Sequence, residues 1–447
     1  MKLPAYVLRC LETLEQAGFA AYAVGGCVRD QLLGLEPQDF DLCTDARPEQ
    51  TQALFADREL VLSGLKHGTV GVISGKDVVE ITTFRTEGGY SDCRHPDWVR
   101  FVDRIEEDLA RRDFTVNAMA WSPTRGLKDP FGGREDLEKG ILRTVGIARE
   151  RFREDALRIL RGARFAAKYR LEPEKETFEA MVELAPLMED LARERVFSEL
   201  CKLLLHADTR DLMRYAPLIT QVIPELAPTL GFDQRCQHHA FDLYTHIAHV
   251  TGGVPRELPL RWAALLHDLG KLSTFTLDEQ GQGHFYGHAQ VSARLAGEIL
   301  HRLKAPTALT EEVVTLISQH MTLTEPQRNL LKRRLSRLGA QQFFRLLDLQ
   351  EADTTNKGIP EPGRVENFRL LREMTRELLE EQACLSLRDL QVNGRDLMAL
   401  GFPAGKSLGS CLNRLLDRVL DETLPNEKAS LLEAAKIYLN APEEVTP

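Results

Sequence analysis

Apolar and polar positions follow two different patterns along this chain of 447 residues. Before residue 140, short apolar runs are separated by turn signals such as Gly-Gly at 25–26 and SGKD at 74–77. From about 141 onward, apolar residues recur at helical spacing, as in RILRGARFAAKY and WAALLHDL. The pattern predicts an α/β head followed by helices. The predicted strands are AYAV (21–24), DFDLCT (39–44), GTVGVIS (68–74) and VVEITTF (78–84).

Changes in composition and loop signals divide the chain further. Gly- and Pro-containing loops are expected at 251–259, 278–284 and 356–364. We expect four parts, which are a head at 1–140, a basic helical neck at 141–235, a histidine-rich helical domain at 236–357 and a helical tail at 358–447.

The charge of the chain is unevenly distributed. A net charge of −10 and a pI of about 5.7 argue against a nucleic-acid partner, because binding to phosphates requires a basic surface. Between Arg143 and Arg170, however, nine basic residues stand against three acidic ones, which gives a local net charge of +6. The mean charge therefore does not exclude RNA at the neck.

Several features predict a cytoplasmic protein without a membrane partner. No apolar run reaches the roughly 18 residues of a membrane-spanning helix. The first apolar stretch is interrupted by Arg9, Glu12 and Glu15, so no signal peptide is expected. The eight cysteines form no C-x-x-C pair, which favours reduced thiols over disulfides or a zinc ribbon.

The segment AYAVGGCVRDQLLG has the order strand, Gly-Gly turn and helix. Gly25 and Gly26 would let the backbone approach a polyphosphate, and the following helix N-terminus directs N–H groups toward it. Arg29 could add a bidentate phosphate contact. A Gly-Gly pair alone is equally compatible with a tight turn that binds nothing.

Paired aspartates follow this turn. Asp39 and Asp41 are two residues apart on a predicted strand, so both carboxylates would project from one face while Phe40 and Leu42 face the core. Like charges held together favour a cation between them, as in two-metal phosphoryl transfer with Mg²⁺. Glu80, on the second strand of a hairpin, is a weaker candidate for a third catalytic carboxylate. The alternative is an exposed edge with solvated acids.

Basic residues recur after the predicted sheet. Arg112, in an Arg-Arg pair, is a candidate contact for a triphosphate. Asp155, Arg158, Arg161 and Arg164 recur every three residues, which predicts one helical stripe. A carboxylate beside a guanidinium offers the acceptors and donors that pair with the edge of a cytosine or an adenine. From composition alone, a solvated helix face is the better explanation, and the position of the stripe beside the head favours a functional role.

Five ordered motifs, GGCVRD, DFD, RRDFTVNA, DPFGGREDL and REDALRILRGARFAAKY, resemble tRNA nucleotidyltransferases of the class that adds CCA. This class has a polymerase-β-like head, and the C-terminal stretch LQVNGRDLMALGFPAGKSLGS also resembles it. The resemblance implies an α+β head with a small mixed sheet, followed by an all-α neck, a further domain and a tail. It also implies tRNA, CTP and ATP as partners. The implied roles are catalysis and Mg²⁺ binding by Asp39 and Asp41, triphosphate binding by Gly25, Gly26, Arg29 and Arg112, base selection by Asp155 and Arg158, and support by Arg161 and Arg164.

A Gly-rich, polar stretch at 83–102 contains Asp92 and Arg94. In the family that the chain resembles, complete CCA addition accompanies a flexible loop at this place. Its presence favours CCA addition over a CC-only enzyme and leaves an A-adding enzyme open. A poly(A) polymerase of this class would be expected to carry a basic C-terminal extension, which the sequence lacks.

Nine of the twelve histidines lie between 238 and 320. With nearby aspartates they form an ordered series on apolar helical segments, and such residues bind divalent metals that activate water. The series resembles the HD phosphohydrolase superfamily, which implies a site for a transition metal or Mg²⁺, hydrolysis of a phosphomonoester or a 2′,3′-cyclic phosphodiester, and a phosphate contact from Lys271. An inert remnant is the alternative. The implied ligands are His246, His267, Asp268 and Asp353, with His288 and His320 completing a two-metal site.

The sequence therefore predicts a template-independent enzyme that builds or repairs the tRNA 3′-terminal CCA and carries a second, metal-dependent hydrolase activity. Its helical tail, including LKRRLSRLG (331–339), is expected to grip the tRNA backbone. Two further alternatives stay open. One is a nucleotide phosphohydrolase whose head only binds nucleotide, and the other is a non-catalytic RNA-binding regulator.

Overall fold

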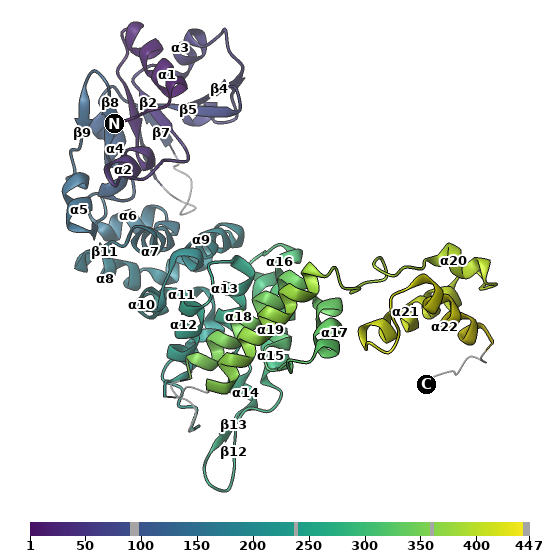
Figure 1. Cartoon of the computed structure of the whole chain (residues 1–447). Helices are drawn as coiled ribbons and strands as arrows, with labels where there is room; N and C mark the ends of the chain where they lie inside the picture. Colours follow the sequence, from purple (N-terminus) through teal and green to yellow (C-terminus); the bar gives the residue numbers. More distant parts are fainter. Residues whose placement is uncertain (90–97, 237–239, 358–361, 441–447) are drawn as a thin grey trace. The chain divides into compact units, whose positions relative to one another are not determined.

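The computed structural model describes residues 1–89, 98–236, 240–357 and 362–440 (Figure 1). The chain forms two compact units. The first comprises Met1–Ala227 with Arg302–Lys304, and the second comprises Pro228–His301 with Ala305–Pro447.

A seven-stranded sheet organises the start of the first unit, in the order β3-β4-β5-β2-β1-β8-β9 (Figure 1). β2 and β5 are parallel, whereas the other neighbours are antiparallel, so the sheet is mixed as predicted. The strands are β1 (Ala21–Val24), β2 (Asp41–Thr44), β3 (Leu60–Val61), β4 (Thr69–Ser74), β5 (Asp77–Thr83), β8 (Ala120–Ser122) and β9 (Gly126–Lys128).

Apolar side chains from the sheet and the following helix form one core of this unit. Tyr22 and Val24 of β1 and Cys43 of β2 are buried with Leu109, which fixes the sheet against α4. Two smaller strand pairs are β6 (Arg85–Gly88) with β7 (Trp98–Phe101), and β10 (Ile141–Leu142) with β11 (Glu172–Pro173). The α-helices are α1 (Ala5–Gln16), α2 (Gly26–Leu32), α3 (Pro48–Leu54), α4 (Ile105–Ala110), α5 (Gly133–Lys139), α6 (Ala148–Glu154), α7 (Leu157–Tyr169), α8 (Lys175–Glu183), α9 (Arg193–His206), α10 (Thr209–Arg214) and α11 (Ala216–Val222).

The strand that carries the paired aspartates is shorter than predicted. β2 begins at Asp41, and Asp39 precedes it. Leu42 is buried as expected, but Phe40 is only partly buried and packs edge-on against Tyr6, with ring centroids 6.4 Å apart. The expectation that Asp39 lies on the strand and Phe40 in the core is therefore wrong, because Phe40 finds its apolar contact on α1.

Asp155 of the predicted stripe lies between two helices of the neck. α6 ends at Glu154, and Asp155 has an extended backbone, with φ −143° and ψ 103°. Its side chain accepts the Leu157 N–H at 3.0 Å, at the start of α7. Asp155 therefore lies immediately before the helix of the predicted stripe and not inside it. Arg158, Arg161 and Arg164 do share α7.

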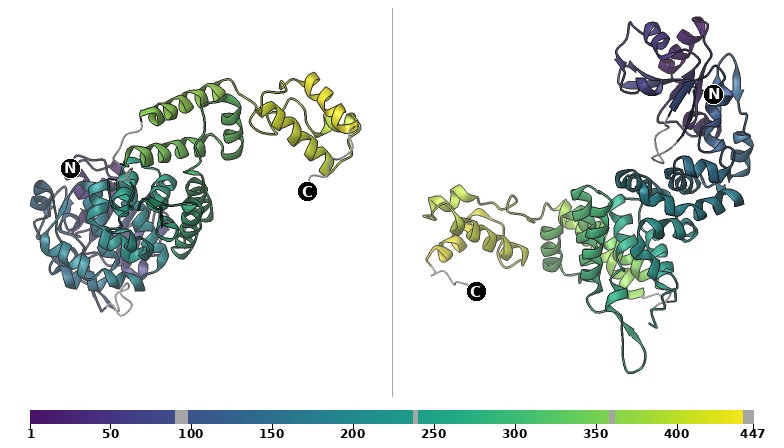
Figure 2. Two further views of the ribbon diagram at one scale, coloured as in Figure 1. Left: turned by 90° about the horizontal axis from the view of Figure 1, so that it is seen from below. Right: turned by 180° about the vertical axis from the view of Figure 1, so that it is seen from behind.

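The described residues of the second unit are helical apart from a short hairpin of β12 (Thr276–Leu277) and β13 (Gly283–His284), which encloses most of the loop predicted at 278–284 (Figure 1). Leu331, Phe343 and Phe368 belong to a core between α17, α18 and α19. α20, α21 and α22 pack around a further core (Figure 2). The helices are α12 (Leu243–Gly253), α13 (Leu258–Leu266), α14 (Lys271–Thr274), α15 (His288–Arg302), α16 (Thr307–Gln319), α17 (Arg328–Leu338), α18 (Ala340–Thr355), α19 (Pro362–Glu380), α20 (Gly394–Ala399), α21 (Lys406–Leu420) and α22 (Lys428–Asn440).

The predicted fold class, a mixed α+β head followed by helices, is confirmed. Among the described residues, no helix combines the length and the apolar character that crossing a membrane requires.

Candidate active sites

Three carboxylates gather where β2 begins. Because β2 and β5 are parallel neighbours, Asp41 lies directly opposite Glu80, and Asp39 lies two residues before Asp41. Desolvation raises the pKa of Asp41, Arg112 opposes this effect, and the charges of Glu80 and Asp39 add to it. A cation among the three groups would relieve their repulsion, and carboxylate oxygens are ligands that suit Mg²⁺.

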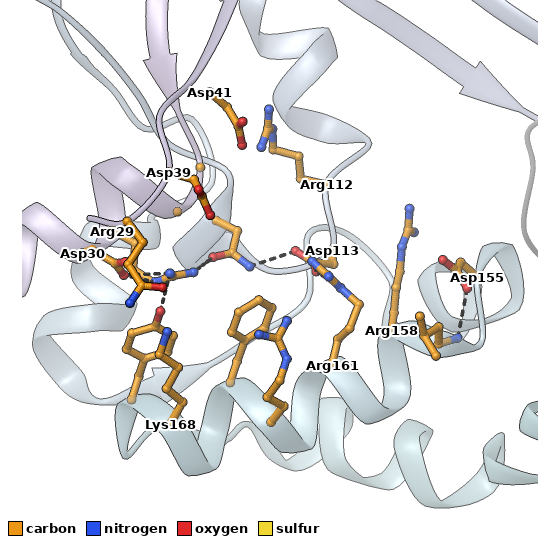
Figure 3. Close-up of a pocket in the computed structure, with 18 of the residues that line it drawn as sticks. Arg29, Asp30, Asp39, Asp41, Arg112, Asp113, Asp155, Arg158, Arg161 and Lys168 are labelled. Carbon is orange, nitrogen blue, oxygen red and sulfur yellow. Dashed lines mark hydrogen bonds and ion pairs between the residues drawn. The ribbon is translucent and has the colours of Figure 1, made fainter. Parts of the chain in front are cut away.

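Asp39 and Asp41 also line a cavity of about 500 Å³ in the first unit (Figure 3). Five carboxylates line it against eight Arg and Lys side chains, so its walls favour an anion. The lining residues come from α2 and the turn before it, the end of α4, the neck helix α7 with the residues just before it, and the start of α9. They include Gly25, Gly26, Arg29, Arg111, Arg112, Asp155, Arg158, Arg161, Arg164, Lys168 and Arg195.

The Gly-Gly turn has a defined geometric role. Gly25 has φ +76°, and a Cβ there would lie 2.7 Å from Nη1 of Arg112. A side chain at this position is therefore strained and also collides with a cation of the cavity. Gly26 begins α2, and its N–H group is among those without a partner inside the helix. The turn places backbone close to the cavity, as the sequence predicts.

Arg29 is buried, and protein groups surround its guanidinium. It donates to Asp30 Oδ1 at 2.9 and 2.7 Å, to Asn117 Oδ1 and to the Tyr169 hydroxyl. Its Cζ lies 4.1 Å from the centre of the Tyr169 ring. Arg29 thus connects α2 to α7, and a phosphate would have to share it with these partners.

Asp113 and Asn117 continue this network. Asp113 Oδ1 accepts from Asn117 Nδ2 at 3.0 Å, and Asp113 Oδ2 accepts from Arg161 Nε and Nη2 at 2.9 and 2.7 Å. Burial acts to raise the pKa of Asp113, but Arg161 and Asn117 outweigh it and lower this pKa to about 2. The chain of contacts from Arg161 to Arg29 holds one wall of the cavity in place (Figure 3).

The two residues predicted to read the base lie on the same cavity but have other partners. Asp155 Oδ2 accepts from Arg195 Nη2 at 3.1 Å. Arg158 donates to Glu154 and, at 3.2 Å, to the Arg111 carbonyl. A base that paired with Asp155 and Arg158 would therefore compete with Arg195 and Glu154.

The other predicted cations also contact protein acids. Arg112 Nη2 lies 3.6 Å from Asp108 Oδ2, and Arg164 Nε lies 2.7 Å from Glu199 Oε2. The Arg164 guanidinium also stacks on Phe165, 4.2 Å from the ring centre. These pairs orient both cations at the cavity wall. Asp92 and Arg94 lie outside the described residues, between β6 and β7.

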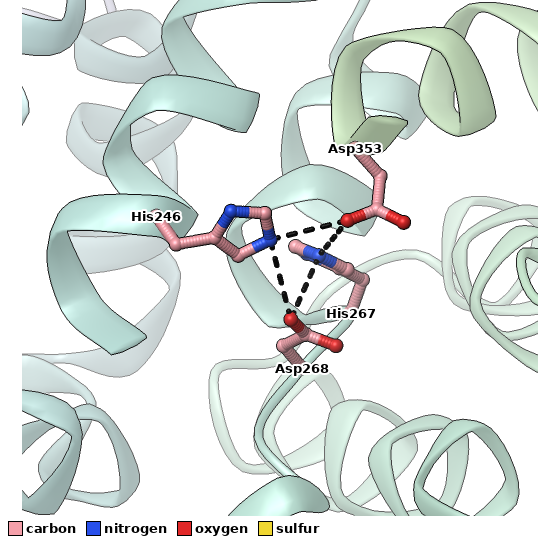
Figure 4. Close-up of side chains that lie close together, drawn as sticks. All are labelled: His246, His267, Asp268 and Asp353. Carbon is pink, nitrogen blue, oxygen red and sulfur yellow. Dashed lines mark ion pairs between the residues drawn. The ribbon is translucent and has the colours of Figure 1, made fainter. Parts of the chain in front are cut away.

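The second candidate site lies in the second unit and gathers six predicted ligands. His246, His267, Asp268 and Asp353 place ligand atoms within 4.8 Å of one another (Figure 4). The ligand atoms of Asp268, His288 and His320 also lie within 4.8 Å of one another. Asp268 belongs to both groups, so its carboxylate could bridge two metal ions. The residues come from α12, the end of α13, the start of α15, the end of α16 and α18.

Each histidine presents Nε2 to the cluster. The Nδ1 atoms of His267, His288 and His320 lie 2.8, 2.7 and 2.6 Å from backbone carbonyls. Because a carbonyl only accepts, each Nδ1 carries a proton, and Nε2 is the nitrogen that each ring can offer to a metal. These three Nε2 atoms are buried and have no hydrogen-bond partner among the described residues. Orphaned nitrogens facing two carboxylates are a donor set that fits a divalent metal.

The charged groups of the cluster shift one another's pKa values. Burial opposes the charged form of His267, but Asp268 and Asp353 outweigh it and raise its pKa to about 9. Burial and the neighbouring His267 lower the pKa of His320 to about 4. Lys271 Nζ lies 2.7 Å from Asp268 Oδ2, and Lys357 Nζ lies 2.8 Å from Asp353 Oδ2. Each of the two ligand carboxylates therefore forms an ion pair with one lysine.

Sequence reasoning missed several of these residues. Lys357 follows Asp353 by four residues, so helical spacing could have identified it. Asp113 and Asn117 stand inside the RRDFTVNA motif but received no role. No local signal marks Arg195, which comes from α9.

Other residues have contacts outside the two sites. Lys332 and Arg333 in the predicted tRNA-gripping segment form ion pairs with Glu422 and Asp421. His249 stacks on Phe241, with ring centroids 4.7 Å apart. His238 and His239 lie outside the described residues.

Three family models match separate parts of the chain. "Poly A polymerase head domain" matches residues 21–143, and "Probable RNA and SrmB- binding site of polymerase A" matches 170–230. "tRNA nucleotidyltransferase domain 2 putative" matches 275–435. The first match contains the three carboxylates at β2 and β5.

Curated proteins and solved structures are similar over nearly the whole chain. The CCA-adding enzyme of Streptococcus pneumoniae strain CGSP14 is 34% identical over 433 residues, which cover 97% of this chain and 96% of that protein. The CCA-adding enzyme of Latilactobacillus sakei is 33% identical over 433 residues, which cover 97% of this chain and 98% of that protein. The crystal structure of the Bacillus stearothermophilus CCA-adding enzyme in complex with CTP superimposes with a TM-score of 0.71 at 30% identity, over 98% of this chain and 99% of that one. The chain therefore belongs to the family of the CCA-adding enzymes, the bacterial tRNA nucleotidyltransferases with a poly(A) polymerase-type head.

Proposed function

We propose that this protein adds and repairs the 3′-terminal CCA of tRNA, using CTP and ATP. The observation that carries the proposal is that Asp39 and Asp41, beside Glu80, line a cavity whose other walls carry eight Arg and Lys side chains. Phosphoryl transfer needs this combination, in which carboxylates hold the metal and cations hold the triphosphate. The CCA-adding relatives and the relative bound to CTP support the choice of substrates.

In this reaction the terminal 3′-hydroxyl oxygen of the tRNA bonds to the α-phosphorus of the nucleotide. The bond from that phosphorus to the oxygen bridging toward the β-phosphorus breaks, pyrophosphate leaves, and the hydroxyl proton passes to solvent. Mg²⁺ held by Asp39 and Asp41 would supply Lewis-acid activation of the reacting oxygens. Gly25, Gly26 and Arg112 hold and orient the triphosphate.

Base selection falls to Asp155 and Arg158, with Arg161 and Arg164 supporting the wall. An acceptor beside donors matches the edges of cytosine and adenine. A base with the opposite arrangement would leave buried polar groups unpaired, which costs roughly 1–3 kcal/mol for each group. A bound base would also replace the contacts of Asp155 with Arg195 and of Arg158 with Glu154. Only a matching base forms new hydrogen bonds that compensate for these lost contacts, so the replacement adds to the discrimination.

The test is incubation with tRNA that lacks its CCA, with CTP and ATP supplied separately and together. CTP alone should extend the tRNA by CC, and both nucleotides should complete CCA. Tails of CC only or A only would replace the proposal by one of the narrower activities. Asp41→Asn should abolish extension, with Asp77→Asn as a control for charge loss at the neighbouring strand. Binding of tRNA without consumption of nucleotide would favour a non-catalytic regulator.

We further propose that the histidine–aspartate cluster of the second unit is a metal-dependent phosphohydrolase centre. Six buried ligands on five chain segments, with Nε2 atoms converging, support this second function. The substrate is a phosphomonoester or a 2′,3′-cyclic phosphodiester. A water oxygen adds to phosphorus, the ester P–O bond breaks, and the leaving alcohol takes the proton. A transition metal or Mg²⁺ would activate that water, while Lys271 contacts the phosphate.

This second activity is separable from the first. The Asp41→Asn protein, which should not extend tRNA, is incubated with 2′,3′-cyclic AMP and each of Mn²⁺, Co²⁺, Ni²⁺ and Mg²⁺. Hydrolysis that disappears in the additional variant His267→Ala would support the proposal. Hydrolysis that survives His267→Ala would assign the activity elsewhere, and no hydrolysis with any metal would make the cluster an inert remnant.

A further inference from the structure

Two aromatic rings stack on the surface next to the histidine–aspartate cluster. The rings of His284 and Tyr286 are nearly parallel, with an interplanar angle of 8° and centroids 5.5 Å apart. Tyr286 is 79% exposed, the largest value among the exposed apolar and aromatic side chains of the described residues. A tyrosine this exposed gains little from the fold, so its ring is available to a ligand.

The residue between the two rings packs on other side chains. His284 ends β13, Phe285 follows it, and Tyr286 lies in the turn before α15. The Phe285 ring has its centroid 5.5 Å from that of Phe275 and 5.2 Å from Lys271 Nζ. These contacts of Phe285 anchor the segment that carries His284 and Tyr286.

This segment also holds a ligand of the cluster. The Phe285 carbonyl accepts from His288 Nδ1 at 2.7 Å. Gly287, with φ +75°, reverses the chain between the exposed Tyr286 and the buried His288. Tyr286 thus lies two residues before His288, whose Nε2 is 3.3 Å from Asp268 Oδ1.

The hairpin fixes the second ring of the pair. His284 ends β13, and its Nε2 lies 2.9 Å from Asp278 Oδ2 across the β12–β13 turn. This contact limits rotation of the imidazole, so the surface offered by Tyr286 is pre-formed. We define His284 and Tyr286 as the aromatic platform.

We propose that the aromatic platform stacks the base of a nucleotide whose phosphate is hydrolysed at the histidine–aspartate cluster, so that this site binds the terminal nucleotide of an RNA more tightly than base-free phosphate esters. The inference rests on the phosphohydrolase proposed above. Base stacking on an aromatic side chain contributes roughly 1–3 kcal/mol and tolerates every base, because each base has a π-face. The site therefore accepts all four bases, unlike the cavity in the first unit.

The test compares two variants of the full-length protein with the wild type. Tyr286→Ala should raise KM for 2′,3′-cyclic AMP by roughly 5- to 100-fold, the equivalent of one stacked base. It should leave kcat and the hydrolysis of glycerol 2-phosphate, which has no base, unchanged. Tyr286→Phe should stay near the wild type. Leu277→Ala is the matched control, because Leu277 is 48% exposed on the same hairpin and lies outside the platform.

A second readout does not need hydrolysis. The fluorescence of a 2-aminopurine nucleoside monophosphate is quenched by stacking, and EDTA prevents hydrolysis during the measurement. The wild type should quench this fluorescence more strongly than Tyr286→Ala does. Leu277→Ala should quench it as strongly as the wild type. A difference in quenching without any hydrolysis would keep the platform and reject the phosphohydrolase. Equal quenching by the wild type and Tyr286→Ala, or hydrolysis with an unchanged KM, would overturn the platform.

Discussion

Asp113 and Arg161 form a two-point contact between the loop after α4 and the neck helix α7. Asp113 Oδ2 accepts from both Nε and Nη2 of Arg161, at 2.9 and 2.7 Å, and the Asp113 side chain is only 8% exposed. Because Asp113 also accepts from Asn117, which accepts from Arg29, one buried carboxylate organises the wall between the Gly-Gly turn and the base-reading residues.

The first prediction concerns the stability that this contact contributes. The pKa of Asp113 is lowered to about 2 in the folded protein, so the contact stabilises the fold above the unfolded pKa and is lost as pH falls from about 4 toward 2. Asp113→Asn should lower the free energy of unfolding at pH 7 by about 2 kcal/mol. Urea denaturation measures this loss.

The pH dependence provides the check on its cause. The difference between the wild type and Asp113→Asn should shrink below pH 4, since the wild-type carboxyl also becomes protonated. Glu135→Gln, which breaks an exposed ion pair with Lys139, should leave the unfolding curve unchanged. A difference that persists unchanged at pH 2.5 would show that packing, and not the charge, is responsible.

The second prediction concerns the Gly-Gly turn. Gly25→Ala strains the backbone at φ +76° and places Cβ against Arg112, so it should raise KM for CTP as well as lower stability by roughly 1–2 kcal/mol. Gly126→Ala is the matched control, because φ is +69° there and no atom lies within 4 Å of the added Cβ. This control should lose similar stability and keep the wild-type KM for CTP. An equal rise in KM for both variants would exclude a specific role of the Arg112 contact.

The sequence predicted the parts of the sites that local spacing encodes. Asp39 and Asp41 are two residues apart, and the ordered histidines lie on or beside apolar helices, so both groups could be recognised without a fold. The parallel pairing of β2 with β5 then sets Glu80 opposite Asp41, which a strand pattern alone leaves open.

The remainder depends on contacts between distant segments. Asp155 meets Arg195, and Arg29 meets Tyr169, 140 residues along the chain, so no local pattern could pair them. The three-residue spacing places Asp155 on the stripe, although its backbone is extended and its side chain accepts the Leu157 N–H at the start of α7.

The third prediction concerns base selection. Arg158→Ala removes the donors from the pair with Asp155, so kcat/KM for CTP relative to UTP should fall by at least about tenfold, the equivalent of one lost matched contact. Primer extension with each nucleotide measures the ratio. Arg170→Ala, at the exposed end of the same helix, should preserve it. Unchanged discrimination in Arg158→Ala would place base reading elsewhere in the cavity.

The last prediction concerns metal content. His246→Ala removes one of the four ligands that include His267, Asp268 and Asp353, and loss of one ligand typically weakens metal binding by orders of magnitude. After dialysis against Mn²⁺, metal analysis should show less bound metal than in the wild type, and EDTA should remove the remainder. CCA addition to tRNA, measured with Mg²⁺ resupplied, should be unaffected because its carboxylates belong to the first unit.

The control for this experiment lies on the same helix. His249 is three residues from His246 on α12, but it stacks on Phe241 and is not among the clustered ligands. His249→Ala should therefore bind as much Mn²⁺ as the wild type, which separates ligand loss from a general effect of removing a histidine from α12. Equal metal content in His246→Ala and His249→Ala would contradict the assignment of the cluster as a metal site, whatever the hydrolase assays show.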